Sequence, residues 1–555
     1  MITPVRFALI ALPLSACSIA LAGPGSIDAG TARANLPPHP AGQLPSTTAS
    51  PPALGTPAIE KIQAGDSSRI QFVSMKIENY ESDVPQDSIA PPLLAPWLGK
   101  AISTSQWKTI SNQLWEAYRS AGLLVRVDLL LNSNGAGTVR ISRLRVHSLN
   151  VKGAPGVSPE ATHRFEMIAK ETIVPGTSVD LPGMEALIRQ FYYRNAEIPR
   201  LDMRSFDAAS VDIDLTLQPP PTPAVPFPWT VTTDSYGLNA FGRGRVSAGY
   251  RMSPLGNGDL FSANALVSAG LQAADLRYEF PAPAMLPLRF AIDYNYLDYH
   301  VQNAPPDAGQ DGYAQTARVE ASYPQFFWGG GMLTHTLSFD EERAADYVSE
   351  INTNLKTLDN LRYRLLGLNF FEGHANGWLE LTHGHVALGG LVAPANNENT
   401  QEAGVFTKAV AEASWHQPFN NWLALDTRLR GQIADKNLDS LEEFTLGGAT
   451  SVRAYDSDQG RGDQGMLVSL DLWATPSSAQ PVRVGVFSDW GTVQVNYHSW
   501  PGAGPNRYNL NSGGVELSYG YQALSLLLSA AHSLTQSSVE QNVGWRLWAE
   551  ASLHF

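Results

Sequence analysis

The chain has 555 residues and a formal net charge of −14. That length exceeds one ordinary domain, and an acidic chain without a basic, aromatic-interleaved patch argues against a nucleic-acid partner. No apolar stretch of about 18 residues or more follows the N-terminus, which argues against membrane-spanning helices. Only 16% of residues are charged and 47 are glycine, a composition typical of alternating strands and turns.

Residues 1–22 have the pattern of a secretory signal peptide. Arg6 supplies the positive charge, a short apolar run follows, and Ala20 and Ala22 frame a small-x-small cleavage site. A second interpretation stays open, because the segment 14–17 reads Leu-Ser-Ala-Cys, as in a lipoprotein processing site that would leave Cys17 lipidated. If Cys17, the only cysteine, leaves with the signal, the mature chain has none, which suits an oxidising periplasm.

Residues 23–68 are rich in Pro, Ala, Ser and Thr, and this composition predicts an extended or disordered linker. Only the stretch from Thr56 to Ala64 could form a short helix. The linker therefore carries no pattern that predicts a long helix.

Two small mixed α/β modules are predicted next, over residues 69–145 and 146–218. The first has a strand over 69–80, a helix that begins at Ser103 or Ser105 and ends at Gly122, and two strands joined by a turn at 132–135. The second is a weaker copy. Its strand-like segments are 146–151 and 211–217, and Met184, Leu187, Ile188 and Phe191 give a helix face between them.

A proline-rich joint over residues 219–228 separates these modules from a long series of alternating segments, 229–555. At about 20 residues per strand and loop, this series would hold about 16 strands. Alternation also fits a soluble sandwich, in which the apolar face would point to a core. Several segments reach the roughly 9–11 residues that a tilted strand needs to cross a bilayer, which favours a transmembrane barrel.

Two motifs lie in the last fifth of the chain. The first is Val452, Arg453, Ala454 and Tyr455, at the end of a Gly-rich segment that begins at Leu446. The second is Phe487, Asp489 and Gly491. Because Val482, Val484 and Val486 share an apolar face, the second motif takes the opposite, lumenal face, and the same parity turns Asp471 inward. Five strand-like segments follow Arg453, which places its loop between the eleventh and twelfth strands of sixteen.

This layout resembles the outer-membrane transporters of two-partner secretion, the family that exports filamentous haemagglutinin and haemolysin. The resemblance implies a mainly β fold, with a C-terminal transmembrane antiparallel β-barrel of about 16 strands behind two polypeptide-transport-associated (POTRA) domains. It also implies that the loop folds into the lumen, where Arg453 meets Asp489. Asp471 stands where an acidic residue is common in the family, and Ala454 replaces its usual glycine. Phe555, which ends the last alternating segment, resembles the signal that barrel-assembly machinery reads.

The resemblance further implies the function and the partners. The chain is expected in the bacterial outer membrane with its POTRA-like domains in the periplasm, where they capture an unfolded haemagglutinin- or haemolysin-like protein for export through the barrel. Barrel-assembly machinery and outer-membrane lipid are the other expected partners. We find no metal-spaced His/Cys cluster, no Gly-x-Ser-x-Gly and no phosphate loop, so no enzyme activity, metal or cofactor is expected.

Three alternatives remain open from the sequence. The first is a factor of the same superfamily that assembles barrels or autotransporters. The second is a passive porin whose front modules serve as adaptors. The third is an outer-membrane hydrolase, for which the sequence offers no nucleophile constellation.

Overall fold

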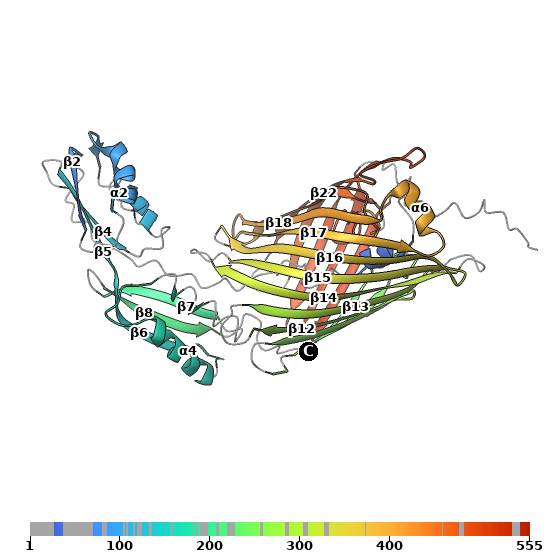
Figure 1. Cartoon of the computed structure of the whole chain (residues 1–555), viewed down its shortest axis with the longest axis horizontal. Helices are drawn as coiled ribbons and strands as arrows, with labels where there is room; N and C mark the ends of the chain where they lie inside the picture. The colour runs from blue at the N-terminus through green and yellow to red at the C-terminus, as the bar shows by residue number, and fades with distance from the viewer. Residues whose placement is uncertain are drawn as a thin grey trace, which may run out of the picture.

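The computed structural model describes residues 27–36, 70–218 and 228–555, with short gaps inside the last two ranges. The predicted signal peptide, most of the linker and nearly all of the proline-rich joint lie outside the described residues. Two α/β modules lie in series at one end of a closed barrel (Figure 1). No helix among the described residues is long and apolar enough to cross a membrane.

The first module packs its helices against a three-stranded sheet of order β2-β5-β4, in which β2 and β5 are parallel. Ile110, Leu114 and Tyr118, on the helix face expected from the sequence, are buried here. The structure adds α2, which the sequence did not predict because Pro91 and Pro92 lie inside it. The elements are β1 (Ile70–Gln71), β2 (Ser74–Asn79), α2 (Gln86–Leu94), η3 (Ala95–Trp97), β3 (Ala101–Ile102), β4 (Val125–Leu131) and β5 (Ala136–Arg143).

The second module repeats this topology, with a sheet of order β6-β8-β7 and parallel pairing of β6 with β8. Met184, Leu187 and Ile188 are buried, as expected, whereas Phe191 lies outside the described residues. The sequence had not predicted α4 or β7. The elements are β6 (Arg145–Gly153), α4 (Pro159–Thr172), β7 (Ile198–Ser205) and β8 (Ser210–Gln218).

The barrel consists of sixteen antiparallel strands and is closed by pairing of its last strand with its first. The predicted strand number is confirmed, and so is the position of the Arg453 loop between the eleventh strand, β19, and the twelfth, β22. The strands are β9 (Trp229–Asp234), β10 (Arg245–Met252), β11 (Leu260–Val267), β12 (Leu271–Pro281), β13 (Arg289–His300), β14 (Gln310–Phe326), β15 (Met332–Val348), β16 (Ile351–Phe370), β17 (Ala375–Gly389), β18 (Gly404–Pro418), β19 (Leu423–Ala434), β22 (Gln464–Ala474), β23 (Val482–Gln494), β24 (Arg507–Tyr521), β25 (Leu524–Ser533) and β26 (Arg546–His554).

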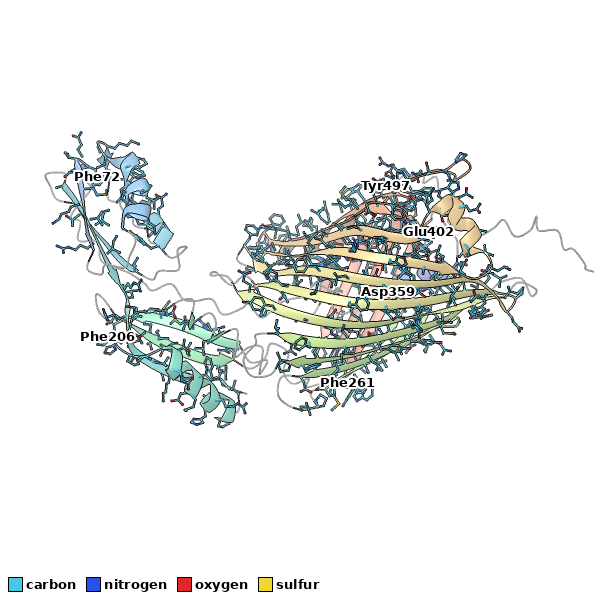
Figure 2. All side chains as sticks on the ribbon, viewed as in Figure 1. Phe72, Phe206, Phe261, Asp359, Glu402 and Tyr497 are labelled. Atoms are coloured by element: carbon cyan, nitrogen blue, oxygen red, sulfur yellow. The ribbon has the colours of Figure 1, made fainter. Side chains whose placement is uncertain are left out.

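Apolar side chains cover the outside of the barrel and polar side chains line the inside. On β26, Leu547 is 71% exposed whereas its neighbour Trp548 is 3% exposed. A soluble sandwich would show the reverse pattern, so the structure confirms the transmembrane interpretation. The outer apolar band has an edge on β16, where Asp359 lies beside Leu361 on the exposed face (Figure 2). The strands around Asp359 therefore continue beyond the lipid-facing band.

The longest connections lie at the end of the barrel away from the modules. One of them joins β17 to β18 and contains α6 (Ala393–Thr400). The other, residues 435–463 between β19 and β22, folds inward and includes the short strands β20 (Phe444–Thr445) and β21 (Arg461–Gly462). We call residues 435–463 the inward loop.

A short helix from the predicted linker, α1 (Ala29–Ala34), lies inside the barrel (Figure 1, blue). The expectation of an extended or disordered segment is therefore wrong for these residues. Asp28 caps the helix by accepting a hydrogen bond from the Thr31 N–H (2.8 Å). Ala29, Thr31 and Ala32 are fully buried against the lumenal wall and the inward loop. Because six residues are too few to form a stable helix alone, these tertiary contacts hold α1 in its helical form.

Candidate functional site: the inward loop and Arg453

Glycines shape the neck of the inward loop. Gly447 has a φ of +76°, and a Cβ there would lie 2.0 Å from the Asp456 carbonyl oxygen. Gly448 also has a positive φ, and its N–H donates to the Tyr455 carbonyl (2.8 Å). The loop can therefore close on itself only with residues that lack a side chain at these two positions. Ala454 is not among the residues with positive φ, so an alanine fits at this position without backbone strain.

The loop tip packs into the barrel wall through apolar side chains. Val452, Ala454 and Tyr455 are fully buried, in a cluster that includes Phe487 of β23. Gly491, two residues beyond Asp489, lies under this cluster, and a Cβ there would be 2.6 Å from Leu446 Cδ2. The glycine of the strand motif thus makes room for the loop. The Tyr455 hydroxyl also shares a hydrogen bond with Ser533 Oγ of β25 (2.8 Å).

Arg453 places its guanidinium among three carboxylates from three neighbouring strands. Its Nε and Nη2 donate to Asp489 of β23 (3.0 and 2.6 Å). Its Nη1 donates to Asp471 of β22 and to Glu516 of β24 (2.7 Å each). The guanidinium carbon also lies 3.6 Å from the centre of the Phe487 ring. Only 8% of the Arg453 side chain is exposed, so water screens these ion pairs weakly.

Backbone and neutral groups complete the Arg453 site. Asp489 is fully buried and also accepts from the Arg453 backbone N–H (3.1 Å) and from Ser512 Oγ (2.7 Å). The Arg453 carbonyl accepts from Trp548 Nε1 of β26 (2.7 Å). The loop tip is therefore attached to β22, β23, β24 and β26 through one residue.

The structure brings together the two sequence motifs and Asp471, and it adds Glu516, Ser512 and Trp548, which the sequence analysis had not singled out. Trp548 lies on the inward face of the last strand, and alternation alone gives no partner for its indole. Phe555 lies apart from this site, at the closing seam, where its N–H donates to the Trp229 carbonyl (3.0 Å). In the described part of the chain, no group of three or more His, Cys, Asp or Glu side chains is arranged to hold a metal ion.

Comparison with known proteins agrees with this architecture. The family model for "Haemolysin secretion/activation protein ShlB/FhaC/HecB" matches residues 212–518, which is more than half of the chain. The heme/hemopexin transporter protein HuxB of Haemophilus influenzae is 25% identical over 453 residues, which cover 75% of this chain and 74% of HuxB.

Solved structures show the same fold. CdiB from Escherichia coli superposes with a TM-score of 0.62 at 16% identity, covering 91% of this chain and 94% of CdiB. CdiB from Acinetobacter baumannii gives a TM-score of 0.59 at 14% identity, covering 91% and 95% of the two chains. The chain therefore belongs to the haemolysin secretion/activation family and is a two-partner secretion transporter of the outer membrane, with POTRA domains in the periplasm and a 16-strand barrel.

Proposed function

We propose that the two POTRA modules, residues 69–145 and 146–218, capture an unfolded secreted protein, which then passes through the lumen of the barrel. The client would be haemagglutinin- or haemolysin-like. Folding of the client outside the cell would drive transport, since the periplasm offers no ATP. The observation that carries the proposal is that the inward loop lies in the lumen and is held to the lumenal wall by Arg453.

Open sheet edges support client capture by the modules. In each module the last strand in sequence, β5 or β8, lies at the centre of the sheet. The edges are therefore β2 and β4 in the first module and β6 and β7 in the second. An extended polypeptide can add to such an edge as another strand. Two exposed apolar side chains lie next to these edges, Val73 (63% exposed) before β2 and Phe206 (56%) after β7. They offer apolar contacts to a chain that adds there.

The contents of the lumen support a gated pathway rather than a passive porin. The inward loop and α1 both lie inside the barrel, and ion pairs with the wall hold both of them. A permanently open channel has no need for such contacts. Ionic contacts of this kind can be exchanged for contacts with a client.

The remaining partners are also proposals. The Phe555 terminus would be read by barrel-assembly machinery, and the exposed apolar band would contact outer-membrane lipid. A factor that assembles other barrels stays the alternative function. It would release its client into the membrane, whereas the proposed transporter releases it outside the cell.

Removal of residues 69–217 tests the capture step. We expect the truncated barrel to insert into the outer membrane, because its sheet is closed without the modules. Client should then accumulate inside the cell and disappear from the medium. Heat-modifiable migration in gels measures the folded barrel, and blotting of the medium measures the client. Secretion at normal yield with a folded barrel would show that the modules are dispensable and would favour the adaptor interpretation.

A further inference from the structure

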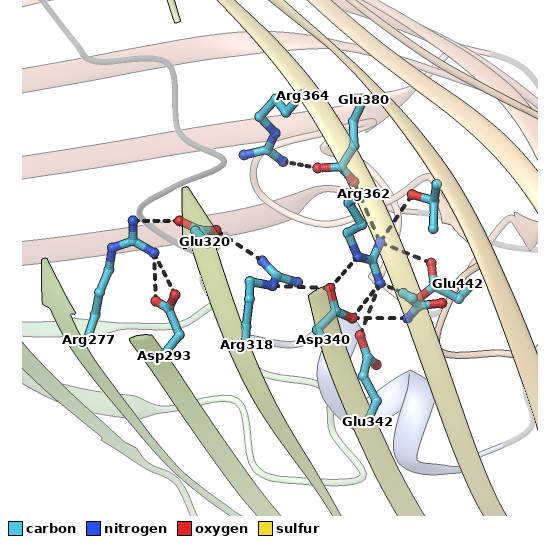
Figure 3. A network of polar contacts seen from close by, with 12 residues as sticks. Arg277, Asp293, Arg318, Glu320, Asp340, Glu342, Arg362, Arg364, Glu380 and Glu442 are labelled. Atoms are coloured by element: carbon cyan, nitrogen blue, oxygen red, sulfur yellow. Dashed lines mark hydrogen bonds and ion pairs between the residues drawn. The ribbon is translucent and has the colours of Figure 1, made fainter. Parts of the chain in front are cut away.

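A second buried charge cluster lies on β15 and β16, apart from the Arg453 site on β22, β23 and β24, and is centred on Arg362 of β16 (Figure 3). Its Nε donates to Asp340 Oδ1 (2.8 Å) and its Nη2 to Glu342 Oε1 (3.1 Å), both on β15. Nη2 also donates to Glu442 Oε1 of the inward loop (2.6 Å). Only 7% of the Arg362 side chain is exposed. One guanidinium therefore joins the barrel wall to the base of the loop.

The helix α1, which lies inside the lumen, also contributes to this cluster. Its Arg33 forms an ion pair with Glu342, the carboxylate that also binds Arg362. Asp28, the cap of α1, pairs with Arg461 at the neck of the inward loop (3.2 Å). Gly30 lies so close to the loop that a Cβ there would be 2.5 Å from the Ser440 carbonyl oxygen. The helix thus contacts both the wall and the loop base.

Glu442 has its own set of partners in this cluster. Lys408 of β18 forms an ion pair with it (2.5 Å), and Asn360 Nδ2 donates to it (3.2 Å). The cations Arg33, Arg362 and Lys408 balance the carboxylates Asp340, Glu342 and Glu442. Around these six groups, Arg318 pairs with Asp340 (3.3 Å), and Glu380 pairs with Arg362 (3.5 Å) and with Arg364 (2.8 Å).

Loss of α1 from the lumen would upset this balance. Without Arg33, Glu342 would keep Arg362, a cation that it shares with Asp340 and Glu442, at a place where water screens poorly. An uncompensated buried charge is strongly unfavourable. The excess negative charge would repel Glu442, which belongs to the loop and can move, more readily than it would displace Asp340 or Glu342, which belong to the sheet.

We propose that Arg362 is a positioning residue that couples α1 to the base of the inward loop, so that release of either one loosens the other. This inference rests on the proposed function in one respect: it takes the lumen as the path of the client, which α1 and the inward loop must leave. Coupling of this kind is reciprocal, because each segment stabilises the arrangement that the other needs.

Two cysteine reporters test the coupling in outer-membrane preparations of the full chain. Ala32→Cys reports on α1, and Leu441→Cys reports on the loop base, since both positions are buried while the lumen is filled. The rate of labelling by a membrane-impermeant maleimide measures the exposure of each. The parent chain, whose single cysteine is Cys17, gives the background. Heat-modifiability shows that each variant has a folded barrel.

Arg33→Ala is the decisive variant, because it leaves every wall residue in place. We expect it to speed labelling of both reporters, including the one at 441 on the loop, by about 5- to 150-fold, the range usual for coupled sites. Arg362→Gln should also speed both. Arg277→Gln is the matched control. Arg277 is similarly buried and pairs with Asp293, Glu320 and Glu279, and within the described residues it has no bond to α1 or to the inward loop (Figure 3). It should leave both rates at the parent value.

Two results would overturn the proposal. In one, Arg33→Ala speeds labelling at 32 and leaves the rate at 441 unchanged, which would show that the two segments move independently. In the other, Arg277→Gln has the same effect as Arg362→Gln, which would indicate general loosening of the barrel. No client takes part in this assay. Independent motion of α1 and the loop would therefore leave the proposed export function standing, and failure of export would leave the coupling result intact.

Discussion

Arg453 holds the tip of the inward loop through ion pairs with three neighbouring strands. Its planar guanidinium meets Asp489 with two nitrogens while a third reaches Asp471 and Glu516. A lysine could not make this set of contacts, because its ammonium is a compact point charge. The consequence is that one substitution removes the ion pairs of the loop tip with three strands at once.

The Arg453 contact predicts a non-additive pair of substitutions. Arg453→Ala leaves Asp489 buried without its cation, and Asp489→Ala leaves the Arg453 guanidinium with its single contacts to Asp471 and Glu516. Each should cost roughly 3–5 kcal/mol in loop attachment, the range for breaking a buried pair, and should cut secretion of the client sharply. The double variant should be little worse than either single variant, since both remove the same contact.

Client in the culture medium, normalised to heat-modifiable barrel, measures these variants. A matched control is Arg483→Ala, which removes an arginine of β23 that is half exposed, lies over the Trp473 ring and has a distant ion pair with Asp426 (3.8 Å). That change should have little effect. Fully additive losses, or normal secretion from Arg453→Ala, would show that the contact does not hold a functional loop.

At the scale of residues, the alternation of side chains along each strand predicted most of the Arg453 site from the sequence. Side chains alternate between the two faces of a strand, so Asp489 and Asp471 point inward once Val484 and Val486 are assigned to the lipid-facing side. Parity cannot say which inward residues meet across strands, because register depends on the whole sheet. Glu516 and Trp548 were therefore missed, although both are inward polar-face residues of later strands.

At the scale of elements, the barrel strands were predictable and the helices were less so. Each strand carries its own alternation, which needs no tertiary information. The helix α1 carries no apolar periodicity over Ala29–Ala34, and its helical form depends on contacts with residues more than 300 positions away, such as Asp346 and Glu342. Its one local signal was the capping residue Asp28.

The position of α1 predicts its effect on the channel. Deletion of residues 27–36 removes an element that is buried in the lumen, and we expect single-channel conductance in planar bilayers to rise, with longer open times. Deletion of residues 41–50, an equal length of the same Pro- and Ala-rich segment, should leave conductance at the parent value. Equal conductance for both deletions and the parent would mean that α1 does not obstruct the channel.

At the scale of the whole molecule, the barrel depends on a short closing seam. The last strand, β26, pairs with β9 through the five residues Glu550–His554, and Phe555 extends the ladder by two backbone hydrogen bonds with Trp229 (2.9 and 3.0 Å). The Phe555 side chain is exposed on the outside of the barrel. The terminus is thus both the end of the ladder and an aromatic group at the membrane face.

Deletion of Phe555 should therefore lower the amount of folded, heat-modifiable protein in outer membranes. It removes two hydrogen bonds from the seam and the aromatic side chain from the terminus. Phe555→Trp keeps both features and should assemble close to normally. Unchanged assembly after the deletion would contradict a role for this residue as the assembly signal.

The central claim is that a polypeptide crosses the membrane through the lumen of this barrel, and site-specific photo-crosslinking tests it most directly. Thr316 and Ala317 are neighbours on β14, the first buried on the lumenal face and the second exposed on the outer face. A photo-crosslinking residue is placed at one position or the other in cells that secrete the client. We predict crosslinks to the client from position 316 and none above background from position 317. Client crosslinks from 317 alone, or from neither position while secretion continues, would contradict transport through the lumen.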